Sequence, residues 1–101
     1  MSDSIDRLSA DARVNRASRI AARVLGGKTV VVVIDDGALH TLNEVGTFVW
    51  QQLEAGEKTV ADLVAAVVDS FEVAASDASR DLDSFLRHMS ELGALEIQEA
   101  A

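Results

Sequence analysis

Residues 26–43 read GGKTVVVVIDDGALHTLN. The run Lys28–Asp35 within this stretch is β-branched almost throughout, which favours a strand. It lies between Gly26-Gly27 and Asp36-Gly37, two dipeptides that tolerate the positive φ of two-residue hairpin turns. The sequence therefore predicts an antiparallel meander of three strands, Arg19–Leu25, Lys28–Asp35 and Ala38–Leu42.

The two turns also predict the register of the sheet. Two-residue loops place Ala22 opposite Val31, Val24 opposite Thr29, Val33 opposite His40, and Val31 opposite Leu42. The faces then differ in polarity, as in a half-buried antiparallel sheet. One face holds Ile20, Ala22, Val24, Val31, Val33 and Leu42, and the other holds Arg19, Ala21, Arg23, Val32, Ile34, Leu39 and Thr41.

Capping residues mark two helices after the meander. Asn43 is a favourable N-cap for a helix that continues through Glu54. Thr59, followed three residues later by Asp62, predicts a capping box for a second helix. The spacing of the apolar residues that follow each cap is helical.

A third helix is predicted from Ser76 to Gly93, followed by a short terminal strand over Ala94–Gln98. Its apolar residues occupy one arc of the helical wheel. The fold class expected is α+β and winged-helix-like, with a three-stranded antiparallel N-terminal sheet, three helices and the terminal strand. The residues of the arc are Ala78, Leu82, Phe85, Leu86, Met89 and Leu92.

Composition excludes several classes of function. The chain has 101 residues, with 17 acidic against 9 basic side chains and a net charge of -8. It lacks the surplus of cations that binding to nucleic acid or to an anionic membrane requires. The absence of Cys excludes disulfides and thiolate metal sites.

The first 17 residues are polar, with isolated Ile5, Leu8 and Val14. They have no periodic apolar face, so a flexible tail that folding does not require is expected over 1–17, with one domain over 18–98. No secretory signal is visible, and the apolar run Val30–Ile34 is too short to span a bilayer. A cytoplasmic location is expected.

The chain carries the short motifs Leu42-Asn43, Gly46 and Val49-Trp50, followed by the loop 56–60, which leads into an amphipathic helix. These motifs resemble the PqqD-like family, and the resemblance covers about residues 18–97. Matches also lie at Arg19–Leu25, Val30–Val33, His40-Thr41, Leu63, Phe71, Leu82, Phe85-Leu86 and Leu92-Gly93.

The resemblance implies a recognition element for the leader of a ribosomally synthesised, post-translationally modified peptide. It implies partnership with a separate modifying enzyme, for which a radical-SAM protein is one candidate, and neither catalysis nor a cofactor in this chain. The leader would add as a strand beside Ala38–Leu42 and lie against the third helix. The peptide-binding residues expected are Ala38, Leu39, His40, Thr41 and Leu42 on the strand, with Asp81, Phe85, His88 and Met89 at the margins of the helix arc.

Two other classes of function stay open. A winged-helix DNA-binding regulator would need a basic recognition helix, whereas residues 77–92 hold four acids against two arginines. A structural or regulatory subunit that binds a folded protein is the second alternative.

Individual residues also have competing interpretations. His40 and His88, without Cys or an obvious carboxylate partner, make a poor metal site, so structural roles are favoured. Asp35-Asp36 is interpreted as turn chemistry rather than as a catalytic carboxylate pair. Trp50 is expected to pack in the core, with a stacking platform for a ligand as the alternative.

Overall fold

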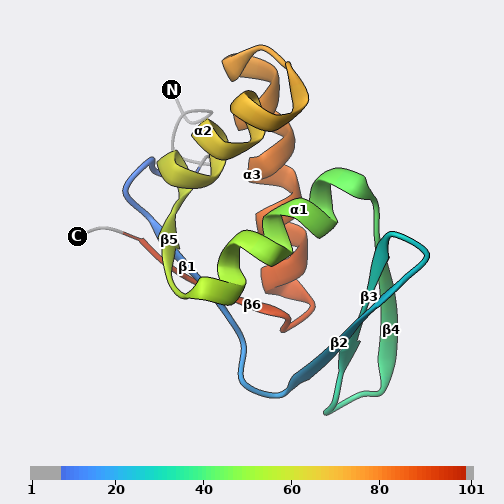
Figure 1. The fold of residues 1–101 in the computed structure, drawn as a ribbon. Coiled ribbons are helices and arrows are strands. Elements are labelled where there is room, and N and C mark those ends of the chain that lie inside the picture. The colour runs from blue at the N-terminus through green and yellow to red at the C-terminus, as the bar shows by residue number, and fades with distance from the viewer. Residues whose placement is uncertain (1–7, 100–101) are drawn as a thin grey trace.

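Two three-stranded antiparallel sheets and three α-helices make up residues 8–99, which this computed structural model describes (Figure 1). The expected α+β, winged-helix-like fold is confirmed. In chain order the elements are β1 (Arg13–Arg16), β2 (Ile20–Leu25), β3 (Lys28–Val33), β4 (Ala38–Leu42), α1 (Glu44–Gln52), the 3-10 helix η2 (Leu53–Ala55), β5 (Lys58–Thr59), α2 (Val60–Phe71), α3 (Ala75–Glu91) and β6 (Leu95–Gln98).

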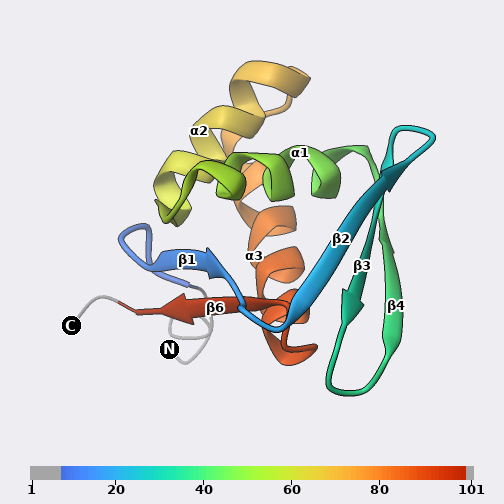
Figure 2. The same ribbon diagram turned by 60° about the horizontal axis from the view of Figure 1, so that its bottom comes forward.

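The predicted meander is present as a sheet of order β2-β3-β4. The turn at Gly26-Gly27 sets the predicted register, because Ala22 pairs with Val31 and Val24 with Thr29. Both glycines have positive φ, which explains why the tight turn falls on them. Figures 1 and 2 show the meander at the right of the helices, whereas β1 and β6 of the other sheet lie at the lower left of both views.

The predicted register between β3 and β4 is wrong by two residues. Val31 pairs with His40 rather than with Leu42, and Val33 pairs with Ala38. The connecting loop covers residues 34–37 instead of two residues, because the Gly37 N–H donates to the Val33 carbonyl oxygen over 2.8 Å. A shift by two leaves every side chain on its predicted face, since the strand period is two.

The interpretation of residues 8–17 as part of a flexible tail is also wrong, while residues 1–7 lie outside the described part of the chain. Residues 13–16 form the central strand of a second sheet, of order β5-β1-β6. Ala12 and Val14 are fully buried, whereas Arg13 between them is exposed. This alternation is that of a half-buried strand. The predicted C-terminal strand is confirmed as β6, which pairs with β1.

The predicted helix caps are confirmed for the first two helices. The Asn43 side chain accepts a hydrogen bond from the Gly46 N–H over 2.8 Å, and Thr59 and Asp62 form both bonds of a capping box. The third helix begins at Ala75, slightly earlier than predicted, and Ala74 precedes it without a side-chain cap. Within residues 8–99, no helix combines the length and apolar character needed to cross a membrane.

The core lies where α1, α2 and α3 meet both sheets. Trp50 is 3% exposed, so its interpretation as a core residue is confirmed. The largest fully buried side chains come from both sheets and all three helices, so one shared core joins these elements. These side chains are Leu63, Leu86, Met89, Val14, Val31, Val49 and Thr29.

Candidate functional site

A groove lies between strand β4 and helix α3. Because β4 ends the sheet order β2-β3-β4, one of its edges has no partner strand among the described residues. The groove encloses about 350 Å³. Its lining residues are Leu39, His40, Thr41, Leu42, Asn43, Phe85, His88, Met89 and Leu92.

Most of the residues expected at the site are brought together here. Residues 39–42, Phe85, His88 and Met89 line the groove, whereas Ala38 and Asp81 do not. Met89 is 1% exposed, so it forms the floor of the groove and belongs to the core at the same time. Phe85 is half-buried and His88 is exposed, as expected for residues at the margin of the apolar arc.

His40 occupies the face of β4 that points toward the core, since its neighbours Leu39 and Thr41 are exposed. Its Nε2 atom is buried without a hydrogen-bond partner among the described residues. The geometry does not bring His40 or His88 into a metal site. Within residues 8–99, no cluster of three or more His, Cys, Asp or Glu side chains could hold an ion.

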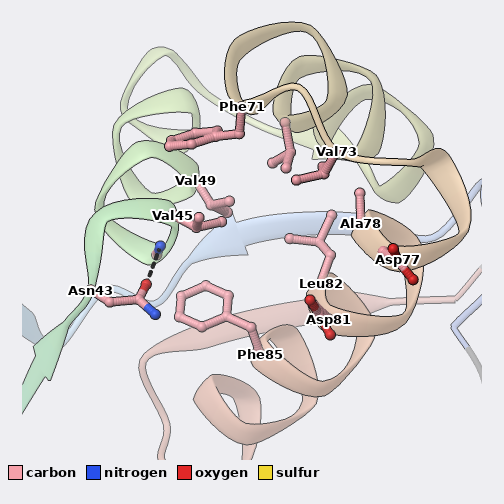
Figure 3. A pocket seen from close by; sticks show the side chains of 12 residues that line it. Asn43, Val45, Val49, Phe71, Val73, Asp77, Ala78, Asp81, Leu82 and Phe85 are labelled. Carbon is pink, nitrogen blue, oxygen red and sulfur yellow. Dashed lines mark hydrogen bonds between the residues drawn. The ribbon is translucent and has the colours of Figure 1, made fainter.

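A second hollow of about 260 Å³ adjoins the groove and was not predicted from the sequence. Asn43 and Phe85 line both, so they mark the boundary between them. Figure 3 shows the Phe85 ring facing the Asn43 side chain at this boundary. The other lining residues are Val45, Gly46, Val49, Val67, Phe71, Val73, Asp77, Ala78, Asp81 and Leu82.

The second hollow is apolar inside and acidic at one border. Phe71 and Val49 face it from α2 and α1, while Asp77 and Asp81 lie on α3 (Figure 3). Asp81 therefore belongs to this hollow and not to the groove beside β4. Two of its apolar lining residues are exposed, Val45 at 36% and Val73 at 39%, which indicates an unfilled apolar surface here.

Helix α3 offers few cations for contact with nucleic acid. Arg80 pairs with Asp77 over 3.2 Å, and Arg87 pairs with Asp83 over 2.9 Å. Both arginines are thus engaged by acids of their own helix. A recognition helix that enters a DNA groove needs cations directed at phosphate, so the DNA-binding alternative is not favoured.

The fold and site define a small winged-helix-like α+β domain in which an open strand edge lies beside a helix. The model of the family "Coenzyme PQQ synthesis protein D (PqqD)" matches residues 28–95, and the chain belongs to this family. A search of curated proteins found no match.

Two solved structures share the fold. One is described as TbiB1 in complex with the TbiA(beta) leader peptide; it is 26% identical with a TM-score of 0.76, and the match covers 81% of this chain and 94% of that one. The other, a lasso peptide synthetase B1 complexed with the leader peptide, is 22% identical with a TM-score of 0.72, covering 82% and 96%. The second likeness concerns the fold alone.

Proposed function

We propose that this protein is a non-catalytic peptide-binding module that holds the leader of a ribosomally synthesised precursor peptide and presents it to a separate modifying enzyme. The observation that carries the proposal is the edge of β4, which has no partner strand among residues 8–99 and lies beside the groove next to α3. It is supported by membership of the PqqD family and by the fold shared with TbiB1, which was solved with a leader peptide.

An extended leader would bind by adding a strand to β4. The unpaired N–H and C=O groups of an edge strand supply main-chain hydrogen bonds, which give affinity with little demand on sequence. Alternate side chains of the leader would point into the groove, against Phe85, Met89 and Leu92. A further apolar side chain would enter the adjoining hollow beyond Phe85.

Charge would favour a leader with basic residues. The protein has a net charge of -8, and Asp77 and Asp81 border the adjoining hollow. Complementary charge of this kind accelerates association and selects among peptides more than it adds affinity.

We assign the chemical modification of the peptide to the enzyme that receives it, and a radical-SAM protein is one candidate for that enzyme. The polar side chains of the groove are His40, Thr41, Asn43 and His88. Asn43 is engaged in capping α1, and none of these side chains is hydrogen-bonded to another in the arrangement of a nucleophile and its base.

Calorimetric titration of the intact protein with its precursor peptide tests the proposal. We expect the unaltered protein to bind the peptide. Asp81→Lys should weaken this binding by about fivefold, because it reverses the charge of one exposed contact with the peptide. The matched control is Asp69→Lys, an exposed acid of α2 outside the groove and its adjoining hollow. If the unaltered protein does not bind the peptide, the proposed function is refuted. If both variants weaken binding equally, the proposed site is refuted.

A further inference from the structure

Strand β2 is the second border of the meander, and it is exposed on both faces. Five of its six residues are exposed, including Val24 at 54% and Leu25 at 57%. Its outer edge has no partner strand among residues 8–99. An exposed apolar edge strand is a site at which another protein pairs or packs.

The sheet face that points away from the core carries an apolar row that begins at this edge and runs across the sheet to β4. Ala21, Val32 and Leu39 are direct cross-strand neighbours, and Leu39 is 68% exposed. Val30 lies beside the row and pairs with Arg23. The opposite face of the sheet packs against the core, and Thr29, Val31 and Val33 are buried there.

Unpaired cations accompany this apolar surface. Arg19 forms an ion pair with Asp35 over 2.6 Å, whereas Arg23 and Lys28 form none with any described residue. Residues 19–34 contain three basic and no acidic residues, while residues 43–91 contain ten acidic and three basic ones. The chain therefore has a basic and apolar surface on β2 and β3 and an acidic helical region.

We propose that the outer β2 face, formed by Ala21, Arg23, Leu25, Lys28, Val30 and Val32, docks the peptide-modifying enzyme through an acidic and partly apolar surface of that enzyme. This inference depends on the proposed function. Because β2 and β4 form opposite borders of the sheet (Figure 2), a leader bound in the groove beside β4 leaves the outer β2 face open, so peptide and enzyme can bind at the same time.

A second copy of this chain fits the same face poorly. A two-fold contact centred on the β2 edge would bring Arg23 close to its own copy, and like charges in apposition oppose association. If the basic face of one copy packed on the acidic helices of the next, the assembly would not close into a ring and would give open filaments. An acidic partner of another kind satisfies both cations.

The test uses the full chain, its precursor peptide and the enzyme that modifies this peptide. Affinities for peptide and for enzyme are measured separately, for the unaltered protein and for Arg23→Glu/Lys28→Glu. We expect the double variant to bind enzyme at least about tenfold more weakly, a change of about 1.4 kcal/mol, and to bind peptide within about twofold of the original. Enzyme binding by the unaltered protein should weaken as salt is raised, because exposed charges are screened.

The matched control is Arg13→Glu/Lys58→Glu, which makes the same change in net charge on the other sheet. It should leave enzyme binding unchanged, and thermal melts verify that both variants fold. Undiminished enzyme binding by Arg23→Glu/Lys28→Glu, or no enzyme binding by the unaltered protein, would overturn the inference. A dimer of the protein alone that this variant abolishes would assign the face to a second copy and overturn it as well. If the unaltered protein binds the enzyme but not the precursor peptide, and the double variant weakens enzyme binding, the docking face stands and the result counts against the proposed function instead.

Discussion

Arg16 of β1 lies over the ring of Trp50 in α1, with its guanidinium carbon 4.5 Å from the ring centroid. Its Nη2 also donates a hydrogen bond to the Trp50 carbonyl oxygen over 2.6 Å. Burial lowers the pKa of the guanidinium, and the charge of Glu54 acts in the opposite direction. The contact attaches the N-terminal strand to the first helix.

Arg16→Ala should therefore destabilise the protein by about 1–3 kcal/mol, through loss of a cation–π contact and a charge-assisted hydrogen bond. The destabilisation by Arg16→Lys should be smaller than that by Arg16→Ala but still measurable, because an ammonium cannot stack and donate as a planar guanidinium does. Urea unfolding measures both. Arg23→Ala, an exposed arginine without an ion pair among the described residues, should stay within about 0.5 kcal/mol of the original. Equal effects of Arg16→Ala and Arg23→Ala would show that the stacking contributes nothing.

Val14→Ala tests directly whether the strand β1 belongs to the fold. The side chain is fully buried opposite Ile97 of β6, so its truncation should cost about 2 kcal/mol and lower the melting temperature by about 8–16 °C. The neighbouring Arg13→Ala, at an exposed position, is the control. If residues 8–16 were a flexible tail, both substitutions would leave the melting temperature unchanged.

Gly46 allows α1 to approach α3 closely. A Cβ atom at this position would lie 3.1 Å from Cε1 of Phe85 and 3.2 Å from Cβ of Leu42. Gly46→Ala gains about 1 kcal/mol of helix propensity but must displace the Phe85 ring, at a cost of about 1–3 kcal/mol. We expect a small net loss of stability and weaker peptide binding, because Phe85 lines both the groove and the adjoining hollow.

Phe85→Leu removes the ring atom that Gly46→Ala would meet, so a double-mutant cycle isolates the contact. The two substitutions should be less destabilising together than the sum of their separate effects, by about 0.5 kcal/mol or more in urea unfolding. If the two losses of stability were strictly additive, the Phe85 ring would move aside for the added methyl group without a free-energy penalty.

Asn43 caps α1 and lies between the two hollows. Asn43→Ala should cost about 1 kcal/mol in the free energy of unfolding, because the Gly46 N–H loses its acceptor. Asn43→Asp retains an oxygen at the same place and adds favourable charge at the helix N-terminus, so its stability should be close to that of the original. Equal destabilisation by Ala and Asp in urea unfolding would contradict the capping role.

Local chemistry accounts for the parts of the fold that the sequence predicted. The turn at Gly26-Gly27 and the caps at Asn43 and Thr59 involve residues a few positions apart, so their signals are readable from short segments. The β3–β4 register was missed because the sequence does not reveal that the Asp36 side chain accepts from the Ala38 N–H over 2.9 Å, which supports the longer loop.

Long-range pairing accounts for what was missed. Strand β1 is held by partners more than forty residues away, at β5 and β6, and two buried residues such as Ala12 and Val14 make too short a pattern to reveal it. The apolar arc of α3 was correctly predicted. Its period does not tell which members meet the core and which border a groove, so only the structure placed Met89 in the floor and Asp81 beside the other hollow.

Backbone amide shift mapping with the precursor peptide tests the central claim most directly. If the leader adds as a strand to β4 and lies against α3, the largest shifts should fall on residues 38–42 and 85–92, with smaller shifts around the hollow beyond Phe85. The outer β2 face should stay silent until the modifying enzyme is added. Shifts confined to α1 and α2, with β4 and α3 unchanged, would contradict the claim.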